Sequence, residues 1–192
     1  MFPPAAVQRA AAATIEVLRR PGDAVSWVKP DNLHYTLRFI GEVGEDGARR
    51  IAEAARDSAA RCPAFDATLG NLGAFPDAPR ARALWLGLST GARELVALAQ
   101  ALEVALESRG FECLRKKFQP HLTIGRVRDP REDWTSRLAS APSIDPANAT
   151  FRVERLCVVE SQLDPRGSIY TIREAAALGG CSGGSDRAPS LR

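Results

Sequence analysis

The two histidines of this chain open the same short phrase, and in each phrase a threonine follows two residues later. The phrases are His34-Tyr35-Thr36-Leu37 and His121-Leu122-Thr123-Ile124. On a β-strand, side chains two positions apart project from the same face, so each phrase predicts an imidazole–hydroxyl pair on one face and apolar residues on the other. A single such pair is typical of a half-buried structural histidine. Two matched pairs instead indicate a functional site, at which an internally duplicated fold presents one phrase from each of its halves.

Hydrophobic periodicity predicts the elements around these phrases. Helices are expected where apolar residues recur at helical spacing, over residues 3–20, 46–59 and 94–109. Strands are expected over residues 25–28, 33–40, 65–69, 83–88, 118–127, 151–160 and 168–172. In the first histidine strand, Tyr35, Leu37 and Phe39 should point to the core. The segment from Leu178 onward is rich in glycine and serine, and we expect residues 178–192 to form a disordered tail.

Length and charge narrow the class of protein. The 192 residues, 45% of them apolar, suit one domain with a core of its own, here over residues 1–177. Two separately folded halves are the alternative, but each half would have a thin core. A formal charge of +3 is too small for a surface that coats DNA, although it suits an anionic substrate held through few phosphate contacts. We expect a monomer without an obligate protein partner.

Cysteine spacing argues against a metal site. Cys62, Cys113, Cys157 and Cys181 form no C-x-x-C pair, so we expect reduced thiols, no bound metal and no cofactor. No apolar run approaches the ~20 residues that span a bilayer, and the N-terminus lacks signal-peptide features. We therefore expect a cytoplasmic protein without membrane attachment.

Two longer segments around the histidine phrases resemble the signatures of a known family. Residues 27–43, which include Pro30-Asp31-Asn32-Leu33-His34, resemble the first signature of the 2H phosphoesterases, and residues 118–126 resemble the second. Within that superfamily the chain is most similar to the RNA 2′,3′-cyclic phosphodiesterases, also called 2′-5′ RNA ligases. Residues 73–76, 79–80, 84–87, 161–163 and 167–170 are similar to the linking strands and the C-terminal hairpin, so the resemblance spans about residues 3–173.

The resemblance implies both a fold and an activity. The fold is a bilobal α+β structure with pseudo-twofold symmetry, in which two antiparallel sheets flanked by helices face a central cleft. The activity is metal-independent hydrolysis of a 2′,3′-cyclic phosphate, at an RNA end or in a small cyclic nucleotide, to a 2′-phosphomonoester. Ligation between 2′ and 5′ ends would be the reverse reaction of the same site.

The chain departs from the family pattern at its N-terminus. Members usually begin with a short apolar strand of the form R-x-F-x-A before the first proline, whereas here Met1-Phe2 directly precedes Pro3. We expect either a truncated N-terminus or a sheet that lacks one strand, with an exposed or incompletely paired edge.

The chemistry of the phrases suggests a role for each residue. Opening a cyclic phosphodiester requires a base for the attacking water and an acid for the departing ribose oxygen, and two imidazoles with pKa values near neutrality can supply both. By analogy with the family, His34 is the acid and His121 the base, although the residues alone also permit the reverse. Thr36 and Thr123 are expected to donate hydrogen bonds to the non-bridging phosphate oxygens.

Four further residues are weaker candidates. Arg38 should share the face of His34 and either reach phosphate or remain a solvated charge. Arg126 matches an arginine of the family, but strand parity places it on the opposite face from Thr123 unless the strand bends. Phe118 and Tyr170 can either stack on a base or belong to the core.

Two alternative functions remain compatible with the sequence. One is a 2H phosphoesterase for another cyclic phosphate or a 2′-5′ oligonucleotide. The other is a catalytically idle nucleotide-binding module, against which the intact histidines and threonines of both phrases argue.

Overall fold

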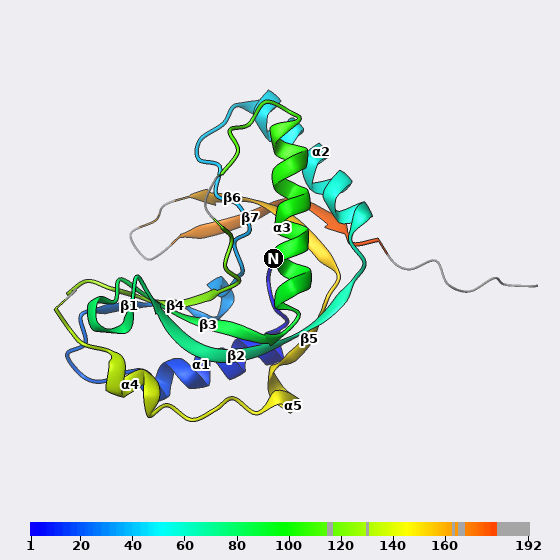
Figure 1. Cartoon of the computed structure of the whole chain (residues 1–192). Coiled ribbons are helices and arrows are strands. Elements are labelled where there is room, and N and C mark those ends of the chain that lie inside the picture. The colour runs from blue at the N-terminus through cyan, green and yellow to red at the C-terminus, as the bar shows by residue number, and fades with distance from the viewer. Residues whose placement is uncertain (115–116, 130, 163, 165–167, 180–192) are drawn as a thin grey trace, which may run out of the picture.

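The computed structural model describes residues 1–114, 117–129, 131–162, 164 and 168–179, and it contains two antiparallel sheets (Figure 1). The larger sheet has five strands in the order β1-β4-β3-β2-β5. These are β1 (Val25–Trp27), β4 (Leu122–Val127), β3 (Ala83–Thr90), β2 (Phe65–Phe75) and β5 (Thr150–Val153). The smaller sheet pairs β6 (Arg155–Gln162) with β7 (Ile169–Ala177). The expected α+β fold with two antiparallel sheets is confirmed.

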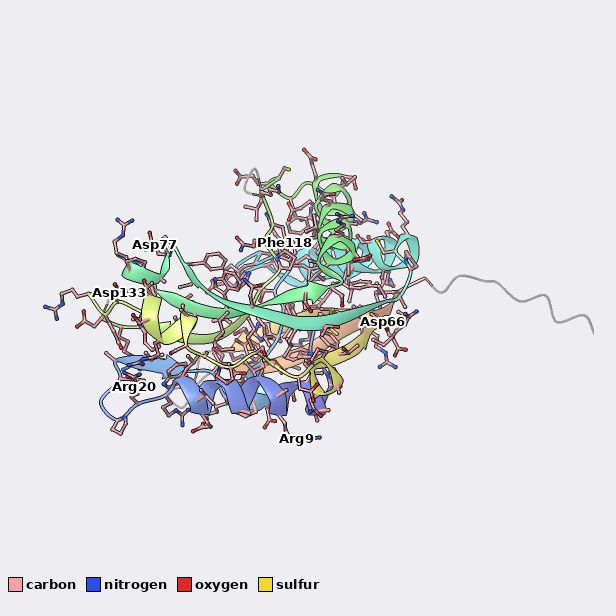
Figure 2. All side chains as sticks on the ribbon, turned by 60° about the horizontal axis from the view of Figure 1, so that its bottom comes forward. Arg9, Arg20, Asp66, Asp77, Phe118 and Asp133 are labelled. Atoms are coloured by element: carbon pink, nitrogen blue, oxygen red, sulfur yellow. The ribbon has the colours of Figure 1, made fainter. Side chains whose placement is uncertain are left out.

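The long helices pack against both sheets: two of them contact the curled five-stranded sheet, and the third packs on β6 and β7. Helix α1 (Ala5–Leu18) lies below the sheet in Figure 2, whereas α2 (Glu45–Arg61) and α3 (Ala92–Glu107) pack together above it. Charged side chains such as Arg9 and Asp66 are at the outside of this arrangement in the same view. Two short helices, α4 (Thr135–Ala139) and α5 (Pro146–Ala149), lie between β4 and β5, and 3-10 turns occur at η1 (Pro30–Asn32) and η2 (Ala78–Arg80).

Periodic apolar residues explain the long helices. The buried positions of α1 and of α3 recur every three or four residues, so each helix turns one stripe toward the core. The most deeply buried side chains of the core include Leu33, Tyr35, Leu84, Leu86, Leu122, Ile124 and Trp134, each at most 1% exposed. The three helices predicted from the sequence are confirmed, with ends shifted by a few residues.

The predicted strand over residues 33–40 is the main error at this level. Only Tyr35 forms a β-bridge there, to Leu122. Phe39, expected in the core, is 79% exposed, so its predicted orientation is wrong. The predicted strand over residues 151–160 is divided between β5 and β6, which belong to different sheets.

The two ends of the described chain are both attached to the fold. Met1 exchanges two hydrogen bonds with Tyr35, of 2.8 Å and 3.0 Å, on the edge of Tyr35 that faces away from β4. Leu178 is 6% exposed, and its N–H donates to the carbonyl of Glu154. Leu178 and Gly179 therefore belong to the fold rather than to the expected tail, while residues 180–192 lie outside the described residues. None of the helices in the described part of the chain is long and apolar enough to cross a membrane.

Candidate active site

The two histidine phrases lie side by side in antiparallel register. Tyr35 bridges Leu122, and both side chains are buried on the core face, at 1% and 0% exposure. In an antiparallel pair, the residues flanking such a bridge also face each other. His34 is therefore opposite Thr123, and Thr36 is opposite His121. All four side chains project from the face opposite to the core, so that each imidazole has the hydroxyl of the other phrase as its cross-strand neighbour.

Both imidazoles are oriented by the same local hydrogen bond. Nδ1 of His34 is 2.7 Å from the carbonyl oxygen of Asn32, and Nδ1 of His121 is 2.8 Å from that of Gln119. A carbonyl only accepts, so each Nδ1 carries the hydrogen and donates it. The Asn32 side chain is itself fixed, because its Nδ2 donates to the Ser168 carbonyl over 3.1 Å. This arrangement leaves Nε2 of each ring available to bind or release a proton.

Aromatic rings hold each histidine from the side. The Tyr170 ring lies 4.8 Å from the His34 ring, centroid to centroid, and Phe2 lies 5.5 Å from it. Phe75 packs edge-on against His121 at 5.0 Å and is backed by Trp85 at 5.2 Å. Both sides of the site thus limit ring rotation through contacts of the same kind.

The environment of His34 favours its neutral form. Burial is the main cause that lowers its pKa below the ordinary value, and the positive charges of the Met1 ammonium and of Arg126 lower it further. The hydrogen bond to the Asn32 carbonyl acts in the opposite direction, because it stabilises a donor. An imidazole with a lowered pKa is a stronger acid once it is protonated.

A bulge in β4 brings Arg126 to the active-site face. Thr123 pairs with Trp85, but the next residue of β3, Leu84, pairs with Gly125, so Ile124 is an extra residue in β4. The bulge shifts the alternation by one position, and Arg126 returns to the side of Thr123. The strand bend on which this candidate depended is therefore present.

Arg38 does not lie free in the site. Its side chain is 8% exposed, and Nη1 lies 3.1 Å and 3.3 Å from the two carboxylate oxygens of Glu103. Nη2 donates to the carbonyl of Glu112 over 2.7 Å. The guanidinium is engaged with α3 and with the segment after it, so the alternative of a solvated charge is wrong.

The two aromatic candidates differ in their surroundings. Tyr170 contacts His34 directly, as described above. Phe118 is half-buried and packs against the hydrophobic core, on the side of the sheet where α2 and α3 lie (Figure 2). The structure thus brings Tyr170 to His34, whereas Phe118 packs against the core.

Sequence reasoning missed the residues that orient the two imidazoles. Asn32 and Gln119 act through backbone carbonyls, which no side-chain pattern reveals, although each precedes its histidine by two positions. Phe75 approaches His121 from β2 through sheet pairing alone. Among the described residues, no group of three or more histidine, cysteine, aspartate or glutamate side chains is placed to hold a metal ion.

Comparison with known proteins identifies the family. The chain matches the 2′-5′ RNA ligase superfamily over residues 3–165. The RNA 2′,3′-cyclic phosphodiesterase of Methanothermobacter thermautotrophicus is 32% identical over 165 residues, which cover 85% of this chain and 88% of that protein. Its counterpart from Thermotoga maritima is 34% identical over 166 residues, covering 86% of each.

Solved structures agree with these matches. E. coli LigT complexed with 3′-AMP has a TM-score of 0.75 and 27% identity, with coverage of 93% of this chain and 94% of LigT. TT0787 of Thermus thermophilus has a TM-score of 0.73 and 26% identity, with coverage of 90% and 93%. The chain therefore belongs to the 2′-5′ RNA ligase superfamily, and it is an enzyme of the kind that the curated relatives represent.

Proposed function

We propose that this protein hydrolyses 2′,3′-cyclic phosphates, at RNA ends or in small nucleotides, to 2′-phosphomonoesters without a metal ion. The observation that carries the proposal is the reciprocal register of the two phrases, in which each imidazole faces the hydroxyl of the other phrase. The names of the curated relatives support the substrate class.

The proton transfers follow from the free Nε2 atoms. Nε2 of His121 takes a proton from water as the water oxygen attacks phosphorus. The bond between phosphorus and the ribose O3′ breaks, and Nε2 of protonated His34 gives its proton to that oxygen. The assignment of acid and base follows the family analogy. After turnover the two imidazoles exchange the proton with solvent.

Charge builds up on the non-bridging phosphate oxygens during attack. The hydroxyls of Thr36 and Thr123 share the face of the two imidazoles and donate to these oxygens. Arg126, which the bulge turns to the same face, adds a positive charge that stabilises the same developing negative charge. Run in reverse with a ribose 5′-hydroxyl in place of water, the same steps would join 2′ and 5′ ends.

The test is turnover by His34→Ala and His121→Ala variants on a panel of cyclic nucleotides and cyclic-phosphate-ended RNAs. Each variant lacks one proton-transfer group, so we expect kcat to fall by roughly 10²–10⁴. Arg109→Met, which breaks the contacts of Arg109 with Glu53 and Asp57 between α2 and α3, is the control for a general loss of stability. Full activity in either histidine variant, with an unchanged circular dichroism spectrum, would disprove the mechanism. Activity of the native enzyme should survive EDTA, and a loss that added metal restores would refute the metal-free chemistry.

A further inference from the structure

Beyond the reacting group itself, the active-site face continues along β4 to a second arginine. Arg128 follows Arg126 by two residues, and its N–H continues the ladder by donating to the Ala24 carbonyl over 2.7 Å. Its Nε donates to Oγ of Ser26 over 2.8 Å, and Ser26 pairs with Arg126 across β1 and β4. Arg128 therefore lies on the same face as Arg126 and Thr123, directed away from His121.

Neither arginine has a charge partner in the part of the chain that the structure describes. Many exposed arginines of this protein pair with a carboxylate, as Arg173 does with Glu160. Within the described ranges, no carboxylate lies within ion-pair distance of Arg126 or Arg128. Asp129, the residue after Arg128, pairs with Arg131, and Asp23, next to the Ala24 that accepts from Arg128, pairs with Arg137. The Ser26 hydroxyl orients the Arg128 side chain without neutralising its charge, so the Nη atoms of Arg128 are available to an anion.

The spacing of the two arginines matches one nucleotide. Residues two apart on a strand are separated by about 6.6–6.8 Å, which is comparable to the span between the phosphates on the 3′ and 5′ sides of one ribonucleotide. With the cyclic phosphate held at Thr123 and Arg126, the 5′-phosphate of the same nucleotide can reach Arg128.

We propose that Arg128, oriented by Ser26, forms a subsite for the phosphate on the 5′ side of the terminal nucleotide. The proposal rests on the proposed function and refines it: the enzyme is built for the end of an RNA chain rather than for a free mononucleotide. Every internal nucleotide of RNA carries this 5′ phosphate, whereas a nucleoside 2′,3′-cyclic phosphate lacks it.

The sharpest test uses two substrates that differ by one phosphate. These are a nucleoside 2′,3′-cyclic phosphate and the same compound phosphorylated at its 5′ position. We expect native enzyme to favour the 5′-phosphorylated compound in kcat/KM by on the order of tenfold, the value of one charge-assisted contact. The preference should decline with salt, with an additional slope of about 0.7 in a plot of log kcat/KM against log salt concentration.

Variants then test whether Arg128 causes the preference for the 5′-phosphorylated substrate. In Arg128→Gln the ratio of the two kcat/KM values should fall to about one, and the additional salt slope should disappear. Ser26→Ala should lower the ratio partially, because Arg128 loses the hydrogen bond that orients it. Arg93→Gln, which removes the same charge from an exposed position at the start of α3, is the matched control and should retain the native ratio. A native ratio near one, or an unchanged ratio in Arg128→Gln, would overturn the subsite.

A binding measurement separates this proposal from the proposed function. Calorimetry can compare a nucleoside 2′-phosphate with the corresponding 2′,5′-bisphosphate, in native protein and in Arg128→Gln, without any turnover. Tighter binding of the bisphosphate that depends on Arg128 supports the subsite even if neither cyclic substrate is hydrolysed. Equal binding of the two compounds by native protein rejects it even if both substrates are hydrolysed.

Discussion

Replacing Arg38 by methionine should destabilise the protein by breaking a largely buried ion pair. The Arg38 side chain is 8% exposed and that of Glu103 is 22% exposed. The same carboxylate accepts the N–H of Leu114 over 3.2 Å, so the pair joins the first histidine phrase to α3 and to the segment that follows it. Nε of Arg38 is buried without a hydrogen-bond partner among the described residues. The contacts of Nη1 and Nη2 with Glu103 and Glu112 are therefore what offsets the burial of the guanidinium charge.

The two single substitutions, Arg38→Met and Glu103→Gln, should lower the free energy of unfolding by different amounts. Removing one partner of a fully buried pair costs about 3–5 kcal/mol. In Arg38→Met, the remaining Glu103 is partly exposed and can be hydrated, so we expect about 2–3 kcal/mol, or a fall in Tm of about 4–12 °C. In Glu103→Gln the more deeply buried guanidinium loses its counter-charge, so this variant should lose more, about 3–5 kcal/mol.

Urea denaturation of the two single variants and the double variant measures the interaction. We expect the double variant to be more stable than the sum of the single losses predicts, by about 1.5 kcal/mol or more. The cross-strand pair Arg152–Asp66, with side chains 50% and 67% exposed, is the control, and its coupling should be below about 1 kcal/mol. Losses of Arg38 and Glu103 that add to within about 0.5 kcal/mol would refute the argument from burial.

The same variants also decide between packing and phosphate binding for Arg38. If Arg38 bound substrate, Glu103→Gln would release the guanidinium and leave KM low, while Arg38→Met would raise KM. If Arg38 instead serves only to pair with Glu103, both variants break the same contact, and their kinetic parameters should change in the same direction.

Two further predictions concern His34 and the end of β7. The lowered pKa of His34 means that the folded state binds its proton less readily than the unfolded state, so its contribution to the free energy of unfolding is lost as the pH falls from about 6.5 through the folded-state pKa. NMR titration should show that Arg126→Gln raises the pKa of His34, and an unchanged value would contradict the influence of Arg126. Leu178→Ala should cost about 2 kcal/mol in urea denaturation, because Leu178 is buried, whereas Val17→Ala, at a 57% exposed position, should cost much less. Equal losses of stability in the two variants would contradict the packing of Leu178 against the fold.

Much of the fold was predictable because its signals are local. The stripes of α1 and α3 and the glycine and proline stops around them follow from spacing along the chain. The split between β5 and β6 was not predictable, since it depends on which strand each segment pairs with, and residues 150–162 are continuously rich in strand-forming residues.

The candidate site was predictable in its residue types but not in its geometry. The two H-x-T phrases singled out His34 and His121, and the bridge between Tyr35 and Leu122 brings the two phrases together. Parity failed at Arg126, because a bulge depends on the partner strand, and at Phe39, because the chain leaves the sheet after the single bridge at Tyr35. Arg38 shows the same limit: its partner Glu103 lies on a helix that sequence reasoning had no means of placing next to it.

The bridge between Tyr35 and Leu122 also bears on how the site forms and on which insertions or deletions the chain can tolerate. Nearly half of the chain lies between the two residues, so the imidazoles meet only when this large loop is closed. The entropy of closing a loop grows slowly, by about 0.6 kcal/mol for each doubling of its length. Insertions and deletions between the two phrases are therefore thermodynamically cheap, whereas a shift of one residue within either phrase would turn its imidazole toward the core.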